Sequence, residues 1–141
     1  MKMRKLVPVS IAALAAAFLL TGCTVTGATA SFAGVPDEHD VSQESEADDS
    51  GLQAFWVEDG SAVAIAISGS STCPVVGTRI NVVSPAGDGN TISIDTAPLP
   101  DRPCTMDFVP HTTVFWTPNT VTTAEPLVVQ VGDRTVTLPV K

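Results

Sequence analysis

The chain has 141 residues, and its 15 acidic and 7 basic side chains give it a formal net charge of −8. This balance excludes binding to nucleic acid through a basic surface, because phosphate contacts need clustered Lys and Arg side chains. The length allows one modest hydrophobic core, so we expect a single folded domain.

The N-terminal segment has the pattern of a secretory signal. Three basic residues, Lys2, Arg4 and Lys5, precede an uncharged run of 15 residues at positions 6–20. A membrane-spanning helix needs about 20 apolar residues, so a retained transmembrane anchor is the weaker interpretation. The pattern therefore favours export.

The apolar run ends in Leu20-Thr21-Gly22-Cys23. This sequence resembles the lipobox of bacterial lipoproteins, in which an apolar residue, a small residue and Gly or Ala precede a Cys. The resemblance covers residues 1–23 only. It implies that the Cys23 thiol takes up diacylglycerol and that Cys23 becomes the new N-terminus, which places the protein at the cell membrane, lipid-anchored on the extracytoplasmic face.

The cysteine count supports the lipobox. An exported chain with three cysteines has one odd thiol, which would be a liability in an oxidising compartment. If Cys23 carries the lipid, Cys73 and Cys104 remain as one disulfide, worth about 3–4 kcal/mol in the chain-entropy model. The alternative is an ordinary secreted protein cut at the A-x-A site that ends at Ala30, although this site lies ten residues beyond Leu20.

Residues 24–51 lack the apolar content of a folded segment. Seven acidic residues and no Lys or Arg lie between positions 34 and 50. Such a segment cannot bury enough apolar surface to offset its conformational entropy, so we expect a disordered tether. The expected organisation is a signal peptide at 1–22, the lipidated Cys and acidic tether at 23–51, and the folded domain at 52–141.

From residue 52 onward the apolar residues alternate with polar ones, which is typical of strands. Turn signals such as Asp59-Gly60 and Gly132-Asp133 fall between the alternating segments. The pattern predicts an all-β fold, a small antiparallel sandwich or barrel for which an immunoglobulin-like architecture is one form. About eight strands are expected, at residues 53–58, 61–67, 78–84, 91–95, 104–109, 112–117, 127–131 and 134–138.

The expected strand at residues 104–109 places Cys104, Met106 and Phe108 on one face. We expect this face to point into the core. Cys73 lies in a stretch rich in Gly and Ser, so the expected disulfide pins a loop to a strand.

Two aromatic pairs, Phe55-Trp56 and Phe115-Trp116, are the best candidates for a binding surface. Adjacent side chains of a strand point to opposite faces, so one member of each pair should leave the core. Alternation with neighbouring valines predicts that Phe55 and Trp116 point inward. Trp56 and Phe115 would then form an exposed apolar patch for a partner. The alternative is that these two rings pack under loops or on a second sheet.

The sequence contains no motif that indicates catalysis. No Ser lies in a G-x-S-x-G elbow, and a triad of Ser70, His111 and Asp107 would have to assemble from distant positions. The acidic stretch at residues 37–40 includes His39, but ordering four adjacent side chains around one ion is costly on a flexible chain. We expect no catalytic residue, no metal site and no cofactor.

Together these features predict a membrane-anchored, noncatalytic binding module of the bacterial cell envelope. Its partner would be an envelope protein or an extracellular ligand, not a nucleic acid. The alternative is a small envelope enzyme or inhibitor that acts on an extracellular substrate.

Replacement Cys23→Ala should leave an unprocessed precursor or shed the protein into the medium, because the thiol is the group that accepts the lipid. Intact-mass analysis of the wild-type protein should find a chain that begins at a diacylated Cys23. A mature chain that begins at Ser31 without lipid would refute this prediction.

Overall fold

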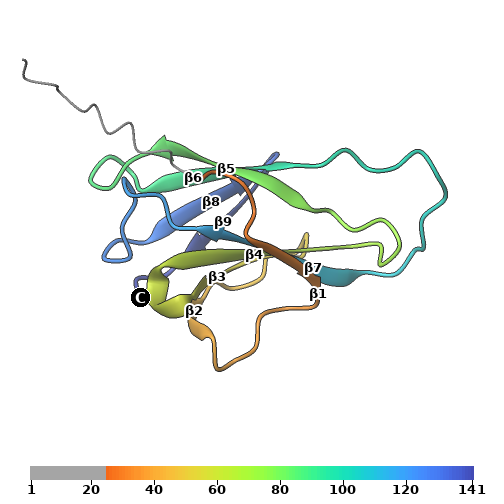
Figure 1. Cartoon of the computed structure of the whole chain (residues 1–141), viewed down its shortest axis with the longest axis horizontal. Helices are drawn as coiled ribbons and strands as arrows, with labels where there is room; N and C mark the ends of the chain where they lie inside the picture. The colour runs from red at the N-terminus through yellow and green to blue at the C-terminus, as the bar shows by residue number, and fades with distance from the viewer. Residues whose placement is uncertain (1–24) are drawn as a thin grey trace, which may run out of the picture.

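The computed structural model describes residues 25–141, so the expected signal peptide and Cys23 lie outside the described residues. Two sheets pack face to face as a sandwich and do not close into a barrel (Figure 1). The strands are β1 Ala30–Ala33, β2 Val41–Glu44, β3 Leu52–Val57, β4 Ala62–Gly69, β5 Gly77–Ser84, β6 Thr91–Thr96, β7 Val109–Trp116, β8 Leu127–Val131 and β9 Arg134–Leu138. A short 3₁₀ turn, Glu58–Gly60, connects β3 to β4.

The first sheet has the order β1-β7-β4-β3-β2, and the second has the order β5-β6-β8-β9. All neighbouring strands are antiparallel except β6 and β8, which are parallel. The all-β sandwich expected from the alternating pattern is therefore confirmed. Seven of the eight expected strands are present.

The main core lies between the two sheets. It is formed by side chains that alternate along each strand, as their period of two requires. The first sheet contributes Leu52, Ala54, Trp56, Val63, Ile65, Ile67 and Phe115, and the second contributes Ile80, Ile92, Ile94, Leu127, Val129, Val131, Val136 and Leu138.

The first sheet is also buried on its other face, which we call the outer face. A second apolar cluster lies there, composed of Phe55, Val57, Ala62, Ala64, Ala66 and Val114 with the half-buried Val41 packed against it. Burial on both faces explains why β3 and β4 read as nearly continuous apolar runs. Apart from the half-buried Gln53, Ser68 and Gly69, every residue of these two strands is buried.

The expectation of a disordered tether at residues 24–51 is wrong for the described part of that range. Strand β1 pairs with β7 from Ala30 to Ala33, and β2 pairs with β3 from Val41 to Glu44. The segment contributes few apolar side chains of its own, but its backbone completes both edges of the first sheet. Backbone hydrogen bonds and the apolar surface of other strands supply what its composition lacks.

The prediction of a strand at residues 104–109 is wrong as well. Residues 103–108 form an exposed loop. Val109, the first residue of β7, is the only residue of the expected strand that lies on a strand. Met106 is fully exposed and Phe108 is 64% exposed, so neither points into the core. The alternation in this segment has no neighbouring strand to pair with, and a strand needs such a partner for its backbone hydrogen bonds.

The expected disulfide between Cys73 and Cys104 is confirmed, with a Cα–Cα distance of 5.6 Å. It joins two loops, because Cys104 does not lie on a strand. The Cys73 loop connects β4 to β5 and the Cys104 loop connects β6 to β7, and together they form the long projection at one end of the sandwich (Figure 1).

Asn90 ties the long loop after β7 to the turn between β5 and β6. Its side chain is buried, and its Nδ2 donates to the carbonyl oxygens of Thr122, Glu125 and Pro126 at 2.9–3.2 Å. Its Oδ1 accepts a hydrogen bond from the Thr122 N–H at 3.0 Å. The residue has φ of +43°, a left-handed conformation that Asn adopts more readily than most residues.

Replacement Asn90→Ala should lower the free energy of unfolding by about 2–4 kcal/mol, because it leaves several buried backbone groups without a partner. Asn90→Asp should cost more, since a carboxylate cannot donate to the three carbonyls. Chemical denaturation followed by circular dichroism measures both. Asn119→Ala, an exposed position in the same loop, is the control and should change stability by less than about 0.5 kcal/mol.

Candidate functional site

A short segment crosses the outer face of the first sheet. Strands β1 and β2 lie at opposite edges of this sheet, so residues 34–40, which we call the strap, must pass over the strands between them. The Gly34 N–H donates to the Pro110 carbonyl at 2.9 Å, and the Thr112 hydroxyl donates to the Gly34 carbonyl at 2.6 Å. These bonds attach the start of the strap to β7.

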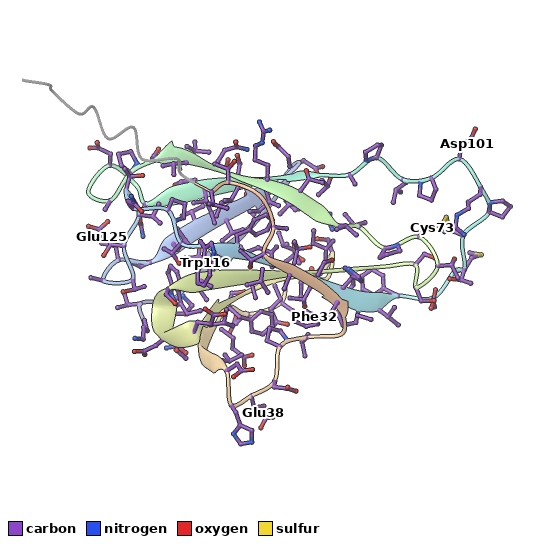
Figure 2. All side chains as sticks on the ribbon, in the orientation of Figure 1. Phe32, Glu38, Cys73, Asp101, Trp116 and Glu125 are labelled. Carbon is purple, nitrogen blue, oxygen red and sulfur yellow. A yellow bond between two sulfur atoms is a disulfide. The ribbon has the colours of Figure 1, made fainter. Side chains whose placement is uncertain are left out.

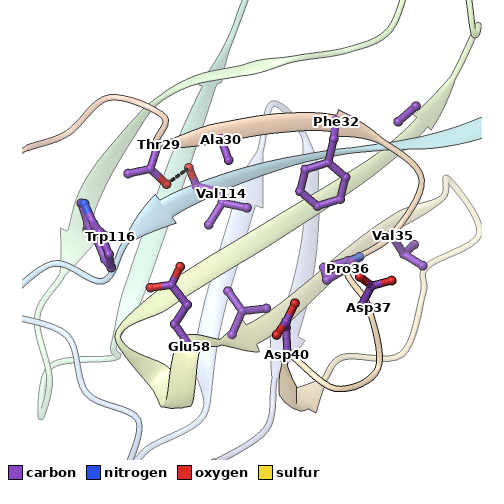
Figure 3. Close-up of a pocket in the computed structure, with 12 residues that line it drawn as sticks. Thr29, Ala30, Phe32, Val35, Pro36, Asp37, Asp40, Glu58, Val114 and Trp116 are labelled. Carbon is purple, nitrogen blue, oxygen red and sulfur yellow. Dashed lines mark hydrogen bonds between the residues drawn. The ribbon is translucent and has the colours of Figure 1, made fainter.

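The strap, β1 and the outer face enclose a groove of about 720 Å³, which we call the outer groove (Figure 3). Its floor includes the apolar side chains of Val57 and Val114. Phe32 of β1 and Trp116 at the end of β7 line it as well. The volume lies in the range of small-molecule and side-chain binding sites.

Two aromatic rings in this groove remain open to solvent. Trp116 is 45% exposed and Phe32 is 37% exposed. Trp116 follows Val114 on the outer face by strand alternation, but it lies at the end of β7, beyond the part of the face that is covered. The expectation that Trp116 points into the core is therefore wrong.

Three carboxylates also line the outer groove. Asp37 and Asp40 belong to the strap and Glu58 to the turn after β3, and no Lys, Arg or His lies among the lining residues. Figure 3 shows Glu58 and Asp40 on the side of the groove opposite Ala30 and Phe32. The groove thus combines aromatic surface with negative charge, and nothing within its lining neutralises that charge.

The Glu58 backbone has φ of +48°, and Asp59 follows with φ of +57°. Non-glycine residues in this region cost of order 1 kcal/mol or more each, so the surrounding contacts must hold the turn in place. The Ser61 N–H and hydroxyl both donate to the Glu58 carbonyl, and Lys141 donates to the Asp59 carbonyl and forms an ion pair with its carboxylate. The turn holds Glu58 at the groove through its backbone.

A second cavity of about 630 Å³ also has Trp116 in its lining. We call it the side pocket, and it includes Val25 and Thr26 from the start of the described chain and Ile80 of β5. Its polar groups are neutral, contributed by Asn81, Thr117, Asn119 and Thr120. Trp116 is the one residue that the outer groove and the side pocket share.

The prediction of an exposed patch at Trp56 and Phe115 is wrong. Both rings are completely buried in the main core, and the Trp56 indole N–H donates to the Pro139 carbonyl at 2.9 Å. Alternation correctly predicted which residues share a face, but it assigned each set to the wrong side. The error arose because both faces of β3 are buried. Phe55 faces outward, but it belongs to the apolar cluster on the outer face.

The structure does not bring together the distant triad of Ser70, His111 and Asp107. Ser70 and Asp107 belong to one hydrogen-bonded network in the disulfide-linked loops, where Thr105 donates to Asp107 and contacts the Ser70 hydroxyl at 2.8 Å. His111 instead contacts the Ser31 hydroxyl through its Nε2 at 2.8 Å. Hydrogen bonds from Ser71 and Thr105 lower the pKa of Asp107 to about 2, which keeps it ionised and acceptor-only at neutral pH.

No group of three metal-ligating side chains converges within residues 25–141. In the same part of the chain, no helix has the length and apolar character needed to cross a bilayer. No family model matches the chain, and comparisons with curated proteins and with solved structures found no match.

The two tryptophans should respond in opposite ways to truncation. Trp56→Ala should lower the free energy of unfolding by about 3–5 kcal/mol, because it leaves a large cavity between the sheets. Trp116→Ala should cost less than about 1 kcal/mol, because its ring is half exposed. Guanidinium unfolding monitored by circular dichroism compares the two variants directly, and equal losses would contradict the assignment of Trp116 to the surface.

Proposed function

We propose that the protein is a lipid-anchored binding module of the bacterial cell envelope that captures a partner in the outer groove without catalysing a reaction. The exposed Trp116 ring, shared by the outer groove and the side pocket, is the observation that carries this proposal. Exposed aromatic rings beside a cavity are typical anchors of binding sites, where they contribute contact area at low conformational cost.

The start of the described chain supports the lipobox over cleavage at Ala30. The Thr26 carbonyl accepts a hydrogen bond from the Ile80 N–H at 2.8 Å, and the Thr29 N–H donates to the Val114 carbonyl at 2.8 Å. Cleavage after Ala30 would remove both contacts and part of the lining of both cavities. Cleavage before Cys23 would leave them intact.

The alternative of an envelope enzyme would have to use the Ser31–His111 contact, the one Ser–His hydrogen bond among the described residues. Neither residue lines the outer groove or the side pocket. A nucleophile needs a base and also a cavity in which a substrate can reach it. The groove offers aromatic and carboxylate groups, which suit recognition.

Site-specific photocrosslinking in the cells that make the protein tests the proposal. A photoreactive phenylalanine analogue at position 116 should give a discrete crosslinked adduct, because the partner would contact this ring. The same group at Asp101 is the matched control, since Asp101 is exposed at the far end of the disulfide-linked loops (Figure 2). We expect at least fivefold less adduct there.

A His111→Ala variant that carries the crosslinker at position 116 should give the same adduct as the parent. Equal adducts at positions 116 and 101 would contradict capture in the outer groove. Loss of the adduct on His111→Ala would favour the enzymatic alternative.

A further inference from the structure

We propose that the outer groove binds the side chain of an Arg residue in an extended peptide segment, whose flanking residues cross Trp116 into the side pocket. The inference rests on the proposed function, because it names the class of partner for the same site. The cavity and the exposed Trp116 ring define the site, and the charge of its lining decides what kind of side chain occupies it.

The charge of the outer groove favours a cationic occupant. Asp37, Asp40 and Glu58 line the groove, and its lining contains no basic side chain. Residues 25–141 contain 15 acidic residues against 4 Lys and Arg, so the field of the whole domain adds to the local one. Such a surface attracts cations and repels anionic ligands, and it raises the rate at which a cationic ligand is captured.

The aromatic walls of the outer groove favour a guanidinium group among cations. Trp116 and Phe32 are exposed aromatic residues, and the face of an aromatic ring attracts a cation through its quadrupole, most strongly for Trp. A guanidinium stacks on such rings and at the same time forms forked hydrogen bonds with carboxylates. The groove offers both kinds of partner, with Glu58 and Asp40 opposite Phe32 (Figure 3).

The site extends beyond the outer groove. The side pocket continues past Trp116 and is lined by neutral amide and hydroxyl groups, among them Asn81, Asn119 and Thr120. These groups can donate to and accept from peptide N–H and C=O groups, whereas they offer no counter-charge to a second cation. A side chain in the groove with peptide backbone along the side pocket matches this division.

Peptide binding to the full chain in detergent tests the proposal. The probe is the peptide Ac-Gly-Ala-Arg-Ala-Gly-NH2, and its control carries citrulline, a neutral isostere of Arg. Because Trp56 is buried, acrylamide quenching of fluorescence reports mainly on Trp116. We expect the Arg peptide to protect Trp116 from quenching, with a dissociation constant at least tenfold lower than that of the citrulline peptide.

Matched variants locate the effect. The double change Glu58→Gln and Asp40→Asn should weaken binding of the Arg peptide at least tenfold, while Asp101→Asn, an exposed carboxylate outside both cavities, should leave it within twofold. Circular dichroism checks that each variant is folded. The affinity for the Arg peptide should also fall as ionic strength rises.

Equal affinity for the two peptides, or no protection of Trp116 by the Arg peptide at millimolar concentration, would overturn the proposal. So would an Asp101→Asn effect as large as that of the groove variant, since it would show attraction by net charge alone. These results would leave the crosslinking at position 116 unaffected, so failure of the cationic specificity is distinguishable from failure of the proposed function.

Discussion

The pairing of one acidic segment with both edges of the first sheet determines most of what is distinctive in this structure. Strand β1 adds to β7, and β2 adds to β3 at the opposite edge, so the seven residues between them have to pass over the outer face. The β4 strand presents the small side chains of Ala62, Ala64 and Ala66 to this face. The outer groove exists because the strap spans the face without filling it.

Alternation of apolar and polar residues was sufficient to predict the sandwich, most of its strands and the sharing of faces within each strand. It could not predict which face of β3 is inner, because a strand buried on both faces shows the same period from either side. For this reason the prediction placed Phe55 in the core and Trp56 on the surface, whereas Trp56 lies in the main core and Phe55 on the outer face. The cysteine count was sufficient to predict the disulfide. It could not show that the disulfide joins two loops, because residues 103–108 alternate like a strand but have no neighbouring strand to pair with.

Strands β1 and β2 could not be predicted from composition. Each has four residues, and their side chains are mostly exposed. Their stabilisation comes from backbone pairing with β7 and β3, which are distant in sequence, and a measure of local hydrophobicity does not detect such pairing. The outer groove was missed with them, since β1 and the strap form one side of it. The sequence contains two signals of the outer groove, which are the acidic run that includes Asp37 and Asp40 and the Trp116 ring next to Phe115.

The ordered start of the domain has a consequence for its height above a bilayer. Only Thr24 separates Cys23 from Val25, and Thr26 is already bonded to β5. With the lipid proposed at Cys23, and at most about 3.6 Å of chain per residue, the first bonded residue would lie within about 11 Å of its anchor. The part of the acidic domain around Thr26 would then lie within about a Debye length of the headgroups, where anionic lipids would repel it. Ligands would meet it at the membrane surface.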